Sequence, residues 1–202
     1  MIEKIKAVID QYTSELRHAN KEEPRKLRFY QAITQLFNGD EEALTTISKM
    51  CLGAEKALSI PLPSRLKTGF ADTQYNHVIF EWKSKLSKSG NQESLQLAEY
   101  LLGNWYAGRR DEFILIATDG MEWHLYAPEF SPEFLINGTL PQDASEIALR
   151  RIESFSVTDS NQIDFYFFLD RYLFKTHPQK PTLSNVQLDF GDTSPIFEKQ
   201  LH

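Results

Sequence analysis

Hydrophobic side chains recur every three or four residues through the first third of the chain, which is the spacing of one helix face. This pattern predicts three helices, over residues 2–16, 24–37 and 41–58. Pro24 suits the first turn of the second helix, because an N–H at that position would have no partner within the helix. Two prolines in the run Ile60–Pro63 predict a clear break after the third helix.

The next part of the chain has runs of β-branched and aromatic residues, interrupted by one amphipathic segment. Strands are predicted near residues 66–74, 78–84, 112–118 and 122–127. Between the second and third strands, residues 92–106 predict a helix. Its expected apolar face consists of Leu95, Ala98, Leu102 and Trp105. Asp119-Gly120 predicts a tight hairpin turn between the last two strands.

After these strands the pattern becomes helical again. Residues 143–154 predict a short helix, and residues 161–175 predict an aromatic-rich helix whose apolar stripe is more typical of a core than of a base-stacking surface. Residues 177–202 are polar, contain Pro and Gly, and are interpreted as a peripheral tail or an interdomain linker of a longer protein. The length of 202 residues fits one domain, here residues 1–176, in which 1–19 form an added N-terminal helix.

The order of these elements predicts the fold class. Helices before, between and after the strands favour an α/β fold, in which helices flank a mixed sheet of four to five strands. Extra helices are expected at the N-terminal and C-terminal ends of that core.

The composition favours a cytoplasmic protein. No run of about 18 apolar residues is present, so we expect no membrane partner. The single cysteine, Cys51, excludes an internal disulfide, fits a reducing compartment and is expected in the core. No Cys and His residues have the spacing of a zinc site, and there is no Gly-rich phosphate loop. His124, on a predicted strand, is interpreted as an ordinary histidine.

The net charge of −6 argues mildly against a free-standing DNA-binding protein. The charge is unevenly distributed, because residues 65–110 hold seven Lys/Arg and four Asp/Glu, a balance of +3. Basic residues in and near this segment could frame a phosphate track, the alternative being a solvated surface of mixed charge. They are Arg65, Lys67, Lys85, Lys88, Arg109 and Arg110.

One motif suggests a chemistry. Asp72 is followed nine residues later by Glu81-Trp82-Lys83, at the end of an apolar run. Strand alternation puts Glu81 and Lys83 on one face, and pairing of the two predicted strands would bring Asp72 beside Glu81. Two neighbouring carboxylates suit a hard cation such as Mg²⁺, and a lysine can orient water or stabilise a developing phosphorane. The alternative is an exposed Glu-Lys pair and an unrelated turn aspartate.

The helix that follows this motif adds a second signal. Gln96 and Tyr100 are four residues apart, so they share one stripe of the predicted helix over 92–106. Taken alone, they could equally be a solvated glutamine and a half-buried tyrosine.

The combined order of Asp72, Glu81-x-Lys83 and Gln96-x-x-x-Tyr100 resembles the PD-(D/E)xK nuclease superfamily. Within it, the chain is similar to the N-terminal nuclease domains of type I restriction subunits and of fused restriction–modification enzymes. The segment 113–126, a strand, an Asp-Gly turn and a Trp-x-x-Tyr strand, is similar to a stretch of those domains. The sequence departs from the pattern at Ala71, where the name of the motif has proline.

The resemblance implies a restriction-endonuclease-like core and a role for each motif residue. Asp72 and Glu81 would hold the metal with the backbone carbonyl of Trp82, and Lys83 would serve the nucleophilic water. Gln96 and Tyr100 would support the site or touch the DNA backbone, with Lys67 and Lys85 as further DNA contacts. Glu22 would reach the metal from the first core helix, although the adjacent Glu23 could face inward instead. A further alternative is that this acid only favours the helix start.

The resemblance therefore implies a DNA endonuclease domain that needs Mg²⁺ or Mn²⁺, the nuclease part of a restriction–modification or defence enzyme. Its expected partners are double-stranded DNA and further methyltransferase or helicase domains, on the same chain or on partner subunits. The alternative is a nuclease-like module that binds DNA or another protein without cutting. A third possibility is an interaction scaffold in which the motif is a coincidence.

Overall fold

The computed structural model describes residues 1–52, 54–62, 65–75, 78–88, 92–109, 113–129 and 140–174, together with the single positions 183 and 186. For residues 52, 54–62, 65–73, 75 and 88, only the backbone is described. The predicted tail over 177–202 lies outside the described residues, apart from those two positions.

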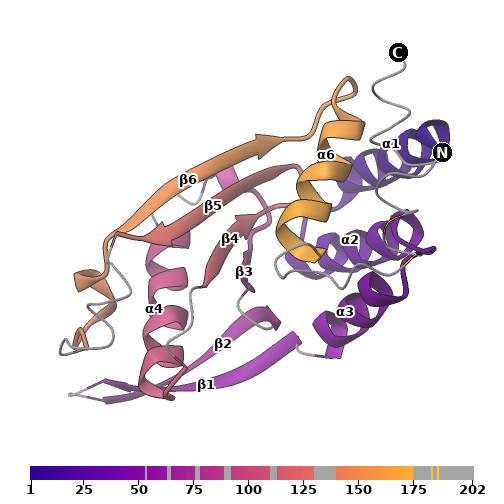
Figure 1. Cartoon of the computed structure of the whole chain (residues 1–202). Coiled ribbons are helices and arrows are strands. Elements are labelled where there is room, and N and C mark those ends of the chain that lie inside the picture. Colours follow the sequence, from indigo (N-terminus) through magenta and orange to yellow (C-terminus); the bar gives the residue numbers. More distant parts are fainter. Residues whose placement is uncertain are drawn as a thin grey trace.

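Helices and strands follow the predicted order except for two further strands, one of which replaces the helix predicted over 143–154 (Figure 1). The α-helices are α1 (Ile2–His18), α2 (Glu22–Leu36), α3 (Glu41–Leu52), α4 (Gln92–Tyr106) and α6 (Gln162–Leu169). The short helices are η1 (Leu86–Lys88), η2 (Ala144–Glu146) and η3 (Asp170–Phe174). The strands are β1 (Ala54–Leu62), β2 (Arg65–Tyr75), β3 (Val78–Trp82), β4 (Ile114–Thr118), β5 (Glu122–Pro128) and β6 (Leu149–Ser156).

The six strands form one mixed sheet in the order β1-β2-β3-β4-β5-β6. Only β3 and β4 are parallel, and α4 is the crossover helix that joins them. All other neighbours pair antiparallel. The α/β class and the mixed sheet predicted from the sequence are confirmed, whereas the expected number of four to five strands is too low.

The additional strand β6 lies where helix was predicted, and β1 covers both the end of the third predicted helix and the break predicted over 60–63, which is wrong because the strand continues to Leu62. The third predicted helix ends at Leu52, and β1 then pairs along its length with β2, from Ala54↔Thr73 to Leu62↔Arg65. The predicted helix over 143–154 is wrong apart from the single turn of η2, because β6 pairs with β5 instead. In both places pairing with the neighbouring strand overrides the local sequence preference.

The sheet separates two apolar cores. Val78, Phe80 and Trp82 of β3 pack into a core shared with α1, α2, α3 and α6. Ile79, on the other face of β3, packs against α4 in the second core. Figure 1 shows the same arrangement, with α4 on one side of the strands and the other α-helices grouped on the other side. This alternation assigns every residue of β3 to a face, and Glu81 shares the α4 face with Ile79.

Two expected core residues lie at the surface instead. Cys51 is exposed, because α3 buries the face of Ala43, Ile47 and Met50 and residue 51 lies beside it. Leu95 is 47% exposed, because the buried stripe of α4 is centred on positions 97, 101 and 104. The aromatic stripe of α6 is confirmed as core, with Phe165, Phe168 and Leu169 buried. No helix within the described ranges is long and apolar enough to cross a membrane.

The hairpin turn between β4 and β5 joins three parts of the fold. The carboxylate of Asp119 accepts the backbone N–H groups of Met121 and Glu122 at 2.9 Å within the turn. Its other oxygen accepts the N–H of Leu86 at 2.9 Å, in the segment that follows β3. This one carboxylate therefore fixes the turn and ties it to the end of β3.

Two helices hold the same turn from the other side. The hydroxyl of Tyr12 on α1 donates to the carbonyl of Gly120 at 2.9 Å. The guanidinium of Arg25 on α2 donates to the carbonyl of Asp119, as well as to Ala19. Gly120 has a φ of 88°, and a Cβ there would lie 2.7 Å from the Tyr12 hydroxyl oxygen.

We therefore expect Gly120→Ala to lower the free energy of unfolding by about 3 kcal/mol, from backbone strain and from the clash with Tyr12 together. The measurement is urea denaturation. Gly108→Ala is the matched control, because Gly108 has a φ of 81° with nothing near its Cβ position, and it should cost only about 1 kcal/mol. Equal losses for the two variants would contradict a role for the packing around Gly120.

Candidate functional site

The backbone register relates Asp72 to Glu81. β2 and β3 pair antiparallel as Thr73↔Phe80, Gln74↔Ile79 and Tyr75↔Val78. Continuing this register by one residue puts position 72 opposite position 81, and residues opposite one another in an antiparallel pair share a face. The side chain of Asp72 and residues 76–77, between the two strands, lie outside what the structure describes.

A buried amide pair shows independently which face this is. Gln74, two residues after Asp72 on β2, donates from its amide to Asn104 of α4 at 2.8 Å. The amide of Asn104 donates in turn to the carbonyl of Tyr100 at 2.8 Å. Because strand positions two apart share a face, position 72 belongs to the α4 face of the sheet, as Glu81 does.

Glu81, Lys83 and Gln96 form a compact polar cluster on that face. The ammonium of Lys83 donates to Glu81 Oε1 at 2.6 Å and to Gln96 Oε1 at 2.5 Å. Only 4% of the Glu81 side chain and 17% of the Lys83 side chain are exposed. The backbone N–H of Lys83 donates to the carbonyl of Thr118 at 2.9 Å, which continues the parallel pairing of β3 with β4. A charged pair this buried needs its hydrogen bonds to offset desolvation, and Gln96 supplies one of them.

The other residues predicted to serve the site are Trp82, Tyr100, Lys85 and Lys67, and those whose side chains the structure describes differ in burial. Trp82 has its side chain in the opposite core, so only its backbone could serve the site. Tyr100 is 7% exposed within the α4 core, a position that suits support of the site better than contact with DNA. Lys85 is exposed, and the side chain of Lys67 lies outside the described residues.

The two acids at the start of α2 point in different directions. Glu22 Oε1 accepts the backbone N–H of Ser84 at 3.2 Å, directly after Lys83. The side chain of Glu23 is 76% exposed and pairs with Lys26 at 2.9 Å. Of the two candidates, Glu22 is therefore the one that lies against the end of β3.

A cavity of about 460 Å³ adjoins Ser84 and Lys85. It lies between the connection of α1 to α2 and the hairpin turn, where Arg17 and Asp119 also line it. None of Glu81, Lys83 and Gln96 lines this cavity, which meets the end of β3 only at Ser84 and Lys85.

Sequence reasoning missed a second polar group on the same face. Glu93 of α4 is 2% exposed, and its Oε1 lies 3.5 Å from the hydroxyl of Tyr126 on β5. Arg151 of β6 donates to that hydroxyl at 3.2 Å, and its guanidinium lies 5.6 Å from the centre of the Tyr126 ring.

His124 lies two residues before Tyr126 on β5. The Asp119-Gly120 turn could have revealed His124, because the turn fixes its register opposite Ala117.

The surroundings of His124 make its charged form unfavourable. Burial lowers its pKa first, and the guanidinium of Arg151 lowers it further. The carboxylates of Glu93 and Asp119 act in the opposite direction without restoring the ordinary value. Its Nδ1 is buried without a hydrogen-bond partner, so His124 is a neutral imidazole near pH 7.

The donor set fits a hard divalent cation. Glu81 supplies one carboxylate, the register continued to position 72 would set Asp72 opposite it, and carboxylate oxygens are the ligands that Mg²⁺ prefers. Among the side chains that the structure describes, no three His, Cys, Asp or Glu residues gather into a metal-binding group. Asp72 is not among those side chains.

Comparison with known proteins returned no relative: no protein-family model, no curated protein and no solved structure matches this chain.

The pKa of His124 provides a test of this geometry by NMR. The native protein should titrate His124 below 6.5, Arg151→Ala should raise that pKa, and Glu93→Gln should lower it further. Arg150→Ala, which removes the same charge one residue away, should leave it unchanged. A His124 that titrates at its ordinary pKa in the native protein would contradict this arrangement.

The same shift sets the sign of a stability effect. Because the pKa of His124 is lower in the folded state, the unfolded state binds more protons below the ordinary value of 6.5. Folding stability should therefore fall as the pH drops through and below 6.5, and His124→Asn should reduce that fall. Urea denaturation of both proteins across this pH window measures it.

Proposed function

We propose that the chain is a Mg²⁺-dependent DNA endonuclease domain with a restriction-endonuclease-like core. The observation that supports it most is Lys83 held between Glu81 and Gln96, next to a strand register that would continue with position 72 opposite Glu81. Three antiparallel strands, a crossover helix and a parallel fourth strand also agree with the order of elements that the resemblance implies.

In this proposal, Asp72 and Glu81 hold the ion with the backbone carbonyl of Trp82. When bound, Mg²⁺ would polarise the phosphate and make water more acidic. Mn²⁺ has similar ligand preferences and could replace it. Glu22, already turned toward Ser84, is placed to join this group directly or through water.

Lys83 has the most specific role among the chain's own groups. Its ammonium is a compact charge with three donors, two of which are used by Glu81 and Gln96. The third can orient the attacking water or meet the charge that develops on the phosphorus oxygens. Gln96 holds the ammonium of Lys83 against this face of the sheet. Tyr100, one turn later on α4, packs into the core between α4 and the sheet.

The substrate proposed for this site is double-stranded DNA, with Lys67 and Lys85 on the phosphate track. The parent protein would be a cytoplasmic restriction–modification or defence enzyme, in which methyltransferase or helicase domains supply sequence recognition. Such an arrangement agrees with the acidic net charge of −6, because the partner domains would supply most of the affinity for DNA.

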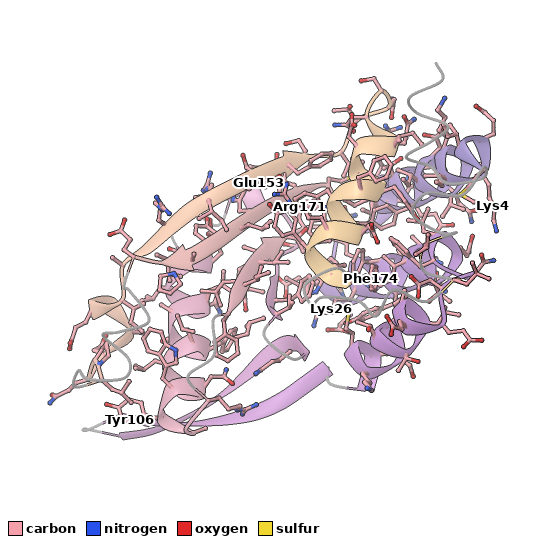
Figure 2. All side chains as sticks on the ribbon, viewed as in Figure 1. Lys4, Lys26, Tyr106, Glu153, Arg171 and Phe174 are labelled. Carbon is pink, nitrogen blue, oxygen red and sulfur yellow. The ribbon has the colours of Figure 1, made fainter. Side chains whose placement is uncertain are left out.

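We expect Asp72→Ala and Lys83→Gln each to reduce Mg²⁺-dependent cleavage of plasmid DNA by at least about 100-fold. Glutamine is chosen at position 83 because it keeps a donor for the buried Glu81 while it removes the charge. Circular dichroism should show that both variants remain folded. Lys4→Ala is the matched control, since Lys4 is exposed on the far side of α1 (Figure 2) and should cut like the native protein. Native cleavage rates in both site variants would reject the proposed function.

The second candidate is a module that binds DNA or protein without cutting. It is favoured by the hydrogen bonds of Lys83 to both Glu81 and Gln96, and by the acidic net charge.

Calorimetric titration with Mg²⁺ and Mn²⁺ separates the two candidate functions. A nuclease should bind metal at millimolar concentration or better and should lose that binding in Asp72→Asn. Absence of metal binding by the native chain would favour the second candidate.

A further inference from the structure

We propose that His124 and Arg151 form a phosphate-binding subsite on the α4 face of β5 and β6, which holds a backbone phosphate of the bound DNA duplex beside the reacting one. This inference rests on the proposed function for the identity of its ligand. The subsite itself consists of residues that the nuclease motif does not contain.

The sheet places this group in one row with the candidate catalytic residues. Glu81 pairs with Ala117 of β4, Ala117 pairs with His124 of β5, and His124 pairs with Ser154 of β6. All four therefore lie on the α4 face, and only the methyl group of Ala117 separates Glu81 from His124. Two strand spacings amount to roughly 10 Å. Because DNA rises about 3.4 Å per nucleotide, one strand could reach both points within about three nucleotide steps.

The chemistry of the two side chains suits an anion. With Nδ1 of His124 buried and without an acceptor, the neutral ring keeps its proton on Nε2, which becomes a hydrogen-bond donor. Arg151 is an exposed residue whose guanidinium has five N–H donors, and the bond to Tyr126 accounts for one of them. A planar guanidinium that can make paired hydrogen bonds is well suited to a phosphate group.

Arg151 is also held in place before any ligand arrives. Its Nη2 donates to the Tyr126 hydroxyl, and the guanidinium stands over the Tyr126 ring. Beyond that hydroxyl lies Glu93, whose Oε2 is buried without a hydrogen-bond partner. A buried carboxylate left in this state is costly, and the nearby charge of Arg151 offsets part of that cost. Glu93 and Tyr126 thus act as positioning residues for Arg151, which reduces the entropy lost on binding.

The test measures duplex binding by fluorescence anisotropy, with Ca²⁺ in place of Mg²⁺ so that binding is separated from cleavage. Arg151→Ala should weaken binding about tenfold, the size expected for one hydrogen bond to a charged group. It should also reduce the slope of log Kd against log salt by about 1, because one phosphate contact is lost. His124→Ala should weaken binding without changing that slope, since a neutral ring releases no counterion.

Arg150→Ala is the matched control. Arg150 is exposed, adjacent in sequence and opposite Ala127, so it lies on the other face of the sheet, and its loss removes the same charge. Glu93→Gln should weaken binding as Arg151→Ala does, but with a smaller change in slope, because the guanidinium remains and only its position is released.

Each outcome decides the proposal. Native affinity and slope in Arg151→Ala, or equal losses in Arg150→Ala and Arg151→Ala, would overturn the subsite. If the native chain still cuts the same duplex with Mg²⁺, that result leaves the nuclease intact. A native chain that neither binds nor cuts the duplex rejects both. Inorganic phosphate at equal ionic strength should leave the NMR signal of His124 unchanged. A change in that signal would overturn the duplex as the ligand and show that the subsite binds a small phosphate compound instead.

Discussion

The parallel pairing of β3 with β4 is the constraint on which the rest of the molecule depends. Two parallel neighbours cannot be joined by a tight turn, so the chain must cross the sheet, and it does so through α4. That crossing lays α4 along one face and brings Gln96 to the end of β3. It also sets Ala117 beside Glu81, and the Asp119-Gly120 turn then sets His124 beside Ala117. Both proposed sites therefore depend on this crossing and on the turn that follows β4.

The buried charges show why the cluster has three members. Glu81 and Lys83 are both largely removed from water, and an ion pair in this setting gains little unless hydrogen bonds satisfy the remaining donors. Gln96 accepts one of these bonds at 2.5 Å. The same arrangement suits the proposed catalysis. Because Glu81 and Gln96 hold the ammonium of Lys83 from two sides, Lys83 stays beside Glu81, where it would orient the attacking water. Stability and the proposed chemistry thus require the same contacts.

Local sequence signals sufficed wherever the structure is decided locally. The limits of α4 were predicted from apolar spacing, and the Asp119-Gly120 turn was predicted from the dipeptide alone. β1 and β6 were missed because each is an edge strand stabilised by pairing with a single neighbour, which the spacing of apolar residues within the strand does not reveal. The choice between Glu22 and Glu23 was open for a related reason. Both suit a helix start, and only the packing of α2 against Ser84 distinguishes them.

The charge of the chain raises a final physical question for the proposed function, since an acidic molecule of net charge −6 should repel DNA. At physiological salt the Debye length is about 8 Å, so charges beyond the contact surface are largely screened. What matters is then the sign of the groups within reach of the phosphates. Lys83 and Arg151 lie on the α4 face, whereas acids such as Glu3 and Asp159 belong to helix α1 and to the segment before α6. Binding at physiological salt should therefore depend on these few cations, and its orientation should be specific because neighbouring side chains fix them.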